Sequence, residues 1–286
     1  MNSVQVSPDT FAVPLNEEVA APASIIAPTK LSERIAGMDV LRGVALLGIL
    51  VMNIDGFGNP GFVHDIPVGT PINNFAGPYA HLNLALLMIK WMFFEGKMRG
   101  FFSMLFGAGV ILLTSRAERR GSMNAADSYI ATALIGSAVS MPIYTIGILK
   151  AYASGFYFLD MDKWLWLPYY LTRETGSLAI AATVILIVKS GVLKMPQRLL
   201  AAVGRTAFSN YILTSLLCQT LFVWGPWKLY GKLEYYQLMY AVFGVWAINL
   251  VVSSLWLRKF AFGPLEWVWR SLTYGVARPM RIEERP

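Results

Sequence analysis

The sequence is poor in the residues from which most catalytic and metal sites are built. Its 286 residues include one cysteine, Cys218, and two histidines, His64 and His81. A single cysteine excludes an intrachain disulfide and any metal site made of several cysteines. The sequence also has no Gly-rich phosphate loop and no His-Glu-x-x-His motif. We therefore expect no metal and no tightly bound cofactor.

Charge is also scarce. Charged residues make up 14% of the chain and hydrophobic residues 56%, and the mean hydropathy is +0.50, whereas a soluble domain is roughly 25% charged. Several long apolar runs then predict a polytopic membrane protein with the lipid bilayer as its main partner. The net charge of +7 is explained by basic loops beside the membrane, so we expect no nucleic-acid partner.

The apolar runs predict an all-α fold, a transmembrane bundle of six spanning helices. We place these helices at about 37–54, 100–115, 128–149, 172–188, 206–224 and 237–257. Two further segments are expected to lie on the membrane surface: residues 82–95, and an amphipathic helix that begins at Pro264.

The two ends of the chain differ from this domain. Residues 1–33 contain four prolines and no basic residue before Lys30. A secretory signal needs a basic start and an unbroken apolar core, so this segment is predicted to be a disordered leader. The membrane domain then covers residues 34–275, and residues 276–286 form a tail.

Basic residues predict the orientation of the helices. The segments 1–37, 114–127, 189–205 and 258–286 together hold 15 Lys and Arg residues, whereas 55–81, 150–174 and 224–236 hold 5. Since basic loops stay on the cytoplasmic side, both termini are expected to be cytoplasmic.

Three blocks of sequence carry a family resemblance. They are Arg34-Ile-Ala-Gly-Met-Asp39-Val-Leu-Arg42-Gly43 with its continuation to Asn53; Phe93-Phe94-Glu95-Gly96-Lys97-Met98-Arg99 with Phe102–Gly109; and Gly204-Arg205-Thr206-Ala207 with Asn210-Tyr211 and Phe262–Trp267. These blocks resemble the YeiB-like family of bacterial membrane proteins, known as domain of unknown function 418. That family is similar in turn to the transmembrane acyltransferases, including the lysosomal heparan glucosaminide acetyltransferases, which share the Asp-x-x-Arg-Gly entry helix.

The resemblance implies a location and a reaction. The location is the bacterial inner membrane. The reaction moves an acyl group from a cytoplasmic thioester, with acyl-coenzyme A as the donor, to an acceptor in the cell envelope. Members of the family have a longer segment between the second and third helices, so this chain resembles a shortened member.

Asp39, Arg42 and Asn53 form the first candidate site. On a helix they fall on one stripe of an otherwise apolar surface, so that stripe is expected to face the protein interior. Asp39 and Arg42 are one turn apart and should pair. The pair either lets the helix start within the interface or, as the resemblance implies, faces the mouth of a cavity.

Glu95, Lys97 and Arg99 form the second candidate site. Charges this dense, at the outer end of the second helix, indicate either a solvated elbow around Gly96 or the rim of a site. The resemblance favours a functional or architectural role. If acyl transfer occurs, Lys97 or Arg99 would stabilise the oxyanion of the tetrahedral intermediate.

Three further groups are weighed in the same way. His64 is the candidate general base, with His81 behind it, although a loop histidine is more often simply solvated. Arginines on the cytoplasmic face either hold the phosphates of coenzyme A or only follow the charge rule for loops: Arg116, Arg119, Arg120 and Arg205. Asn210, with Asn249 and Ser253, lines the cavity or bonds helices to one another.

Two classes of function remain open. One is the acyltransferase, and the other is a non-enzymatic membrane protein: a transport component, an assembly factor or a degenerate family copy. The small pair Ser103 and Gly107 predicts close approach of another helix, and we expect association as a homodimer or with another membrane protein.

Overall fold

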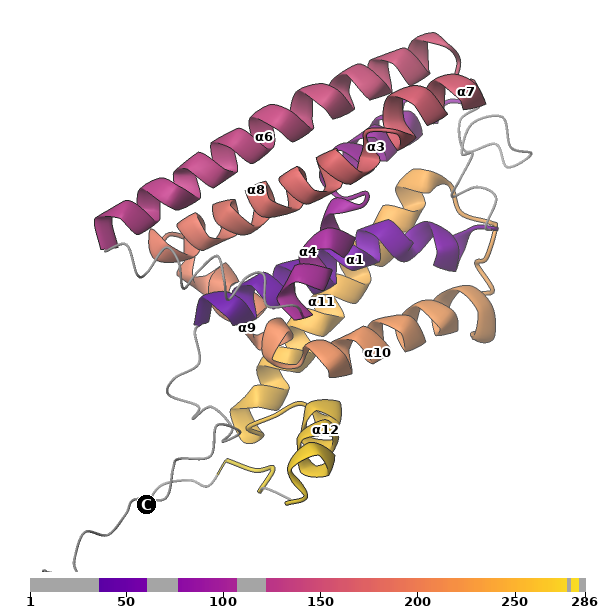
Figure 1. Cartoon of the computed structure of the whole chain (residues 1–286). Coiled ribbons are helices and arrows are strands. Elements are labelled where there is room, and N and C mark those ends of the chain that lie inside the picture. Colours follow the sequence, from indigo (N-terminus) through magenta and orange to yellow (C-terminus); the bar gives the residue numbers. More distant parts are fainter. Residues whose placement is uncertain (1–35, 61–76, 107–121, 277–278, 283–286) are drawn as a thin grey trace, which may run out of the picture. The chain divides into compact units, whose positions relative to one another are not determined.

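The structure is a computed structural model that describes residues 36–60, 77–106, 122–276 and 279–282. Its helices are α1 (Ala36–Gly58), α3 (Ala80–Phe93), α4 (Lys97–Phe106), α6 (Ser122–Ala153), α7 (Phe158–Met161), α8 (Tyr169–Lys189), α9 (Lys194–Arg205), α10 (Ala207–Gln219), α11 (Tyr235–Lys259) and α12 (Pro264–Tyr274) (Figure 1). Two short π-helices, η2 (Asp162–Trp166) and η3 (Thr220–Trp224), precede α8 and follow α10. The described ranges contain no strand beyond an isolated bridge between Phe260 and Arg281. The all-α prediction is confirmed.

Five helical segments in these ranges are long and apolar enough to cross a membrane. They are Gly37–Gly58, Tyr129–Ala153, Leu159–Lys189, Ala207–Trp224 and Tyr235–Lys259, and they match five of the six predicted spans. The remaining span was predicted at 100–115. Its first residues belong to α4, and residues 107–115 lie outside the described ranges, as do residues 1–33 and most of the tail.

Helix α1 is the central element of the bundle. Within its span 67% of the residues are buried, against 39% or less in the other four. It contacts α4 and α8 on one side and α9, α10 and α11 on the other (Figure 1). A helix that is apolar around most of its circumference is suited to such a place. The first of the three blocks that carry the family resemblance therefore lies at the core of the fold.

Two glycines allow α1 and α9 to touch backbone to backbone. A Cβ atom on Gly43 would lie 2.1 Å from the carbonyl oxygen of Leu200, and one on Gly204 would lie 1.8 Å from that of Asp39. Any larger residue would push the helices apart, which is the usual reason for small residues between membrane helices.

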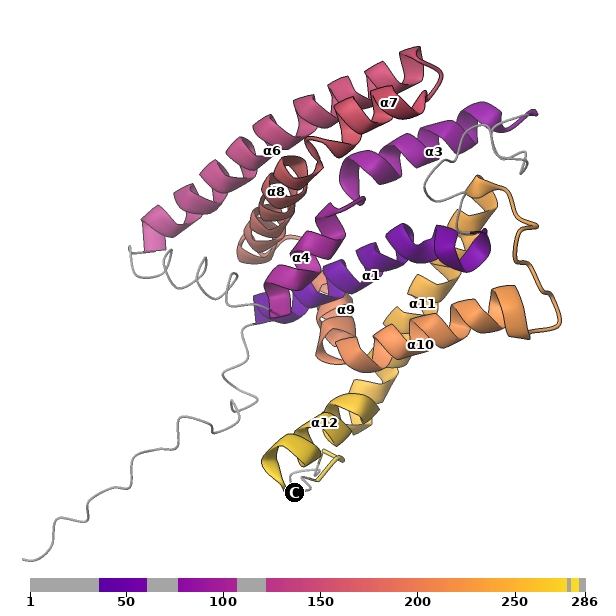
Figure 2. The ribbon, with the colours of Figure 1, turned by 45° about the vertical axis from the view of Figure 1, so that its right-hand side comes forward.

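Helices α3 and α4 follow one another with a sharp bend at Glu95 and Gly96 (Figure 2). Residues 82–95 were expected to lie on the membrane surface. In the structure α3 packs against α6 and α11, and its place relative to a membrane stays a prediction. Its polar residues Asn83 and Lys90 are buried, together with Trp91. The Asn83 and Lys90 side chains point into the bundle, where they contact polar groups of other helices.

Helix α12 begins at Pro264, as predicted, and none of its residues is buried. Val268, Trp269 and Leu272 are exposed on it. This pattern agrees with an amphipathic helix at the membrane interface.

Candidate functional site

The bend between α3 and α4 forms the centre of the candidate site. Gly96 has φ of +69°, a left-handed conformation that glycine adopts readily. A Cβ atom there would lie 2.7 Å from the ring and hydroxyl of Tyr169. Both the backbone angle and the space therefore require glycine. The bend ends α3 and turns the next residue, Lys97, into the bundle.

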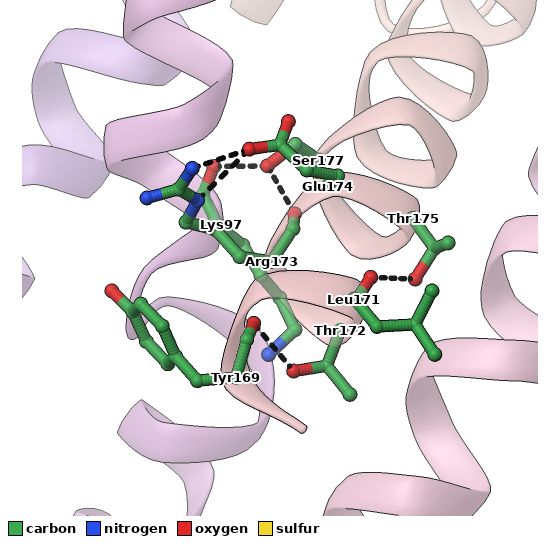
Figure 3. A network of polar contacts seen from close by, with 8 residues as sticks. All are labelled: Lys97, Tyr169, Leu171, Thr172, Arg173, Glu174, Thr175 and Ser177. Carbon is green, nitrogen blue, oxygen red and sulfur yellow. Dashed lines mark hydrogen bonds and ion pairs between the residues drawn. The ribbon is translucent and has the colours of Figure 1, made fainter. Parts of the chain in front are cut away.

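Lys97 is completely buried. Its Nζ lies 3.6 Å from the centre of the Tyr144 ring and donates to the carbonyl oxygen of Trp91 at 3.3 Å. The stem of the side chain passes Gly176, where a Cβ atom would meet it at 2.9 Å. In Figure 3 the side chain extends along α8 toward Thr172. Among the described residues no carboxylate lies within ion-pair distance of Lys97.

Glu95 supplies the negative charge of the site. Its Oε2 atom is buried and has no hydrogen-bond partner among the described residues. The side chain lines a small cavity of about 30 Å³, together with Tyr144, Tyr169 and four apolar or aromatic residues. That volume is close to the share of one water molecule in liquid water, about 30 Å³. The Glu95 side chain therefore borders a space that one water molecule or a small ligand atom can fill.

Hydrogen bonds fix the start of α4 against α8. The Ser177 hydroxyl lies 2.7 Å from the carbonyl oxygen of Lys97 and 2.6 Å from that of Arg173 (Figure 3). Arg173 in turn pairs with Glu174 on the exposed side of α8. Both ends of Lys97 are therefore held: its backbone carbonyl by Ser177 of α8, and its Nζ by Trp91 and the Tyr144 ring.

The sequence analysis missed a buried ion pair. Lys90 of α3 forms an ion pair with Asp55 of α1, and both side chains are buried. Tyr235 of α11 lies near this pair and is buried. A lone lysine within the apolar run 82–95 was the signal that could have found it, because such a residue needs a partner inside the bundle.

Asp39 and Arg42 pair as predicted, at 3.3 Å between Arg42 NH1 and Asp39 Oδ1. The Asp39 side chain is 5% exposed and that of Arg42 is 37% exposed. The pair therefore sits at the border of the bundle. Whether it faces the mouth of a cavity stays a prediction.

Asn53 and Arg99 do not lie where the sequence placed them. Asn53 is exposed and does not share the buried face of Asp39. Arg99 is exposed on α4, whereas Lys97 is buried, so these two charges do not share one surface. Asn53 and Arg99 instead line one crevice of about 540 Å³. The spacing on α4 causes this separation, because residues two apart on a helix point about 200° away from each other, and Lys97 and Arg99 therefore project from different faces of α4.

Arg205 and Asn210 serve the architecture of the fold. Arg205 donates to the carbonyl oxygen of Ala261 at 3.2 Å. The Asn210 amide donates to the hydroxyl groups of Ser253 and Thr206, at 2.7 and 2.9 Å. Thus α10 is bonded to α11, and Asn210 is occupied by helix packing.

The third sequence block is held together by Glu266. Its carboxylate accepts the backbone N–H groups of Phe208 and Ser209, at 2.7 and 3.2 Å, and the Ser209 hydroxyl. These amides belong to the first turn of α10, which has no partners within its own helix. Glu266 of α12 therefore caps α10 and links the two halves of this block.

Some of the predicted residues cannot be placed. His64, Arg116, Arg119, Arg120 and Gly107 lie outside the described ranges, and His81 is exposed at the start of α3. Within the ranges that the structure describes, no three metal-ligating side chains gather.

Comparison with known proteins identifies the family. The family model described as "Protein of unknown function (DUF418)" matches residues 118–276, more than half of the chain. YxaH of Bacillus subtilis is 42% identical over 80 residues, and YeiB of Escherichia coli is 44% identical over 81 residues; each alignment covers 28% of this chain and 20% of the relative. A 39.9 kDa protein from the amylase 3′ region of Bacillus acidopullulyticus is 23% identical over 359 positions, covering 90% of this chain and 99% of that protein.

The relatives carry no assigned function, since all three are described as uncharacterized. The chain matches only a fifth of the length of YxaH and YeiB. No solved structure is similar to it. From the match over 118–276, the chain belongs to the DUF418 family, whose members are proteins of unknown function.

Proposed function

We propose that the chain is a membrane-embedded acyltransferase whose reacting groups lie at the bend between α3 and α4. The observation that carries this proposal is the buried Lys97 beside Glu95, which has an unpartnered buried oxygen. An ionisable group inside a membrane costs about 2.5 kcal/mol or more, so two of them on an interrupted helix favour a functional role. The resemblance of Asp39-x-x-Arg42-Gly43 to the entry helix of transmembrane acyltransferases supplies the class of reaction.

The roles follow from charge. Glu95 takes the proton of an acceptor hydroxyl group, and the hydroxyl oxygen attacks the carbonyl carbon of the thioester. Lys97 stabilises the negative oxygen of the tetrahedral intermediate. When this collapses, the carbon–sulfur bond breaks, and the proton held by Glu95 passes to the departing thiolate.

His64 stays an alternative base, and acyl-coenzyme A is the proposed donor. Arg116, Arg119 and Arg120 would hold its phosphates. Arg205 is a poorer candidate, because it already donates to Ala261.

Transfer of label tests the proposal. Purified wild-type protein is incubated with radiolabelled acetyl-coenzyme A and then with envelope glycan fractions, beside Glu95→Gln, Lys97→Met, Arg42→Ala and His64→Ala. We expect transfer by the wild type, a loss of about 100-fold in Lys97→Met and a similar loss in Glu95→Gln. Glu174→Gln, an exposed acid on α8, is the matched control and should keep full activity. Absence of transfer by the wild type would reject the acyltransferase. Activity that depends on His64 but not on Glu95 would assign the role of general base to His64 instead of Glu95.

In the proposed topology the protein lies in the bacterial inner membrane, with both termini on the cytoplasmic side. Tyr230 lies in the turn before α11, and Ser190 lies in the turn after α8; both are exposed. In a Cys218→Ser background, Tyr230→Cys should react with an impermeant thiol reagent from outside, and Ser190→Cys only after permeabilisation. Labelling from the same side would overturn this orientation.

We also propose that the chain is a shortened family member that associates through its exposed helix faces. The alignment with the 39.9 kDa relative runs over 359 positions, more than the 286 residues of this chain. Ser103 is exposed on α4, where it can meet another helix. A single monomeric mass in several mild detergents would contradict the association.

One observation favours a different function, that of a transport component. Interrupted helices near the middle of a membrane bundle are typical of secondary transporters, where the freed backbone groups bind substrate or ions. The bend between α3 and α4 has this form. Uptake of a labelled envelope precursor into vesicles, lost in Lys97→Met without any acyl transfer, would support this alternative.

A further inference from the structure

We infer that the crevice between α1, α4, α10 and α12 binds a long-chain fatty acid, with its carboxylate held by Arg99 and Asn53. This site lies apart from Glu95 and Lys97. It holds whether the chain is an enzyme or a transport component.

The walls of the crevice are apolar. Four helices contribute them: Ile49 and Met52 from α1, Phe102 from α4, Ala207, Phe208 and Tyr211 from α10, and Trp269 from α12. The volume of about 540 Å³ lies within the range of ordinary ligand sites, roughly 300–1,000 Å³. A single alkyl chain fits this space better than a phospholipid with two chains.

Two polar side chains lie in this apolar setting. Arg99 is exposed into the crevice, and among the described residues no carboxylate lies within ion-pair distance of it. Asn53 lines the same crevice from α1. A guanidinium group pairs with a carboxylate through two parallel hydrogen bonds, and the Asn53 amide can donate a third. Arg99, a cation that pairs with no described carboxylate and lies in an apolar crevice, therefore favours a ligand with an anionic group attached to an apolar chain.

The position of the crevice fits entry from the membrane. Ala207 is the first residue of a membrane span, and α12 is the amphipathic helix that is capped onto α10 through Glu266. Trp269, which is 65% exposed, is the contribution of α12 to the wall. A fatty acid in the bilayer would meet this opening without crossing water.

Quenching of tryptophan fluorescence by 9,10-dibromostearate tests the site, because bromine on the chain quenches a tryptophan that it contacts. In mild detergent the wild type should show saturable quenching, and Trp269→Phe should lose that component. Arg99→Gln should weaken binding of the acid about tenfold and leave binding of its methyl ester unchanged. Arg99→Lys keeps the charge and should fall between the two.

Two further variants distinguish binding of the alkyl chain of the fatty acid from binding of its carboxylate. Ala207→Phe fills the crevice and should reduce binding of both the acid and the ester, whereas Arg258→Gln, at an exposed arginine of α11 outside the crevice, should change neither. Equal affinity of wild type and Arg99→Gln for the acid would overturn the assignment of the carboxylate. No quenching at Trp269, with a dimeric mass in the same detergent, would assign the crevice to a second copy of the chain.

Discussion

On one side of α1, hydrogen bonds between polar groups join neighbouring helices, as Asn210 does with Ser253 and as Glu266 does with the start of α10. On the other side, around α3, α4 and α8, the bundle encloses full charges: Lys90 with Asp55, and Lys97 near Glu95 but in no ion pair with a described residue. The first side uses polarity to hold helices in register. The second keeps charge in a place where packing alone would favour apolar residues. This difference separates the structural side of the bundle from the side that we propose to be functional.

The largest change is expected when the paired charge is broken. Lys90→Met leaves Asp55 buried without its lysine, which costs about 3–5 kcal/mol of stability. Thermal unfolding in detergent measures the loss. The double variant Lys90→Met/Asp55→Leu should recover more than half of it, and a double variant as unstable as the single one would mean that the pair is not the cause.

Close packing on the structural side gives the next largest effect. Gly204→Ala places a Cβ atom against the carbonyl of Asp39 and should lower the free energy of unfolding by about 3 kcal/mol. Gly244→Ala is the matched control, since a Cβ atom at Gly244 meets nothing within 4 Å. Alanine there should be neutral or stabilise α11 by up to about 1 kcal/mol. Equal melting temperatures would show that α1 and α9 do not touch closely.

A smaller effect is expected at the border pair. Arg42 is 37% exposed on its side chain, so solvent screens its interaction with Asp39. Asp39→Asn should therefore cost about 1 kcal/mol, well below the loss in Lys90→Met. The double variant Asp39→Asn/Arg42→Gln should show coupling in a double-mutant cycle, and strictly additive losses would contradict the pairing.

The smallest change in stability is expected from Lys97→Met. Methionine keeps most of the side-chain volume beside Gly176 and removes a charge that has no ion pair. The free energy of unfolding should stay equal or rise by at most about 1 kcal/mol, which thermal unfolding in detergent measures, while acyl transfer is lost. A large destabilisation would give Lys97 the same structural role as Lys90 and remove the contrast between the two sides.

The sequence predicts the fold far better than it predicts the site. Length and composition of the apolar runs are enough for five of the spans, and spacing alone predicts the pair of Asp39 and Arg42. The placement of Glu95, Lys97 and Arg99 failed for a physical reason. Neighbours in sequence were assumed to share one surface, but Lys97 and Arg99 are two residues apart on α4 and so point in nearly opposite directions, Lys97 into the bundle and Arg99 to its surface. Lys90 and Asp55 are 35 residues apart, so only the packing of α3 on the bundle shows that they meet.

The ion pair of Lys90 with Asp55 also has a consequence for how the protein enters the membrane during synthesis. Helix α3 has 14 residues and α4 has 10, each shorter than the roughly 20 that a helix needs to span a bilayer. A lysine costs the insertion machinery about 2.5–3.5 kcal/mol at the centre of an inserting helix and less toward its end, and Lys90 lies in the last turn of α3. Helix α1, made first, carries the aspartate that offsets this cost. We therefore expect α1 to wait beside the translocon until α3 has emerged, and the two to pass into lipid as one hairpin.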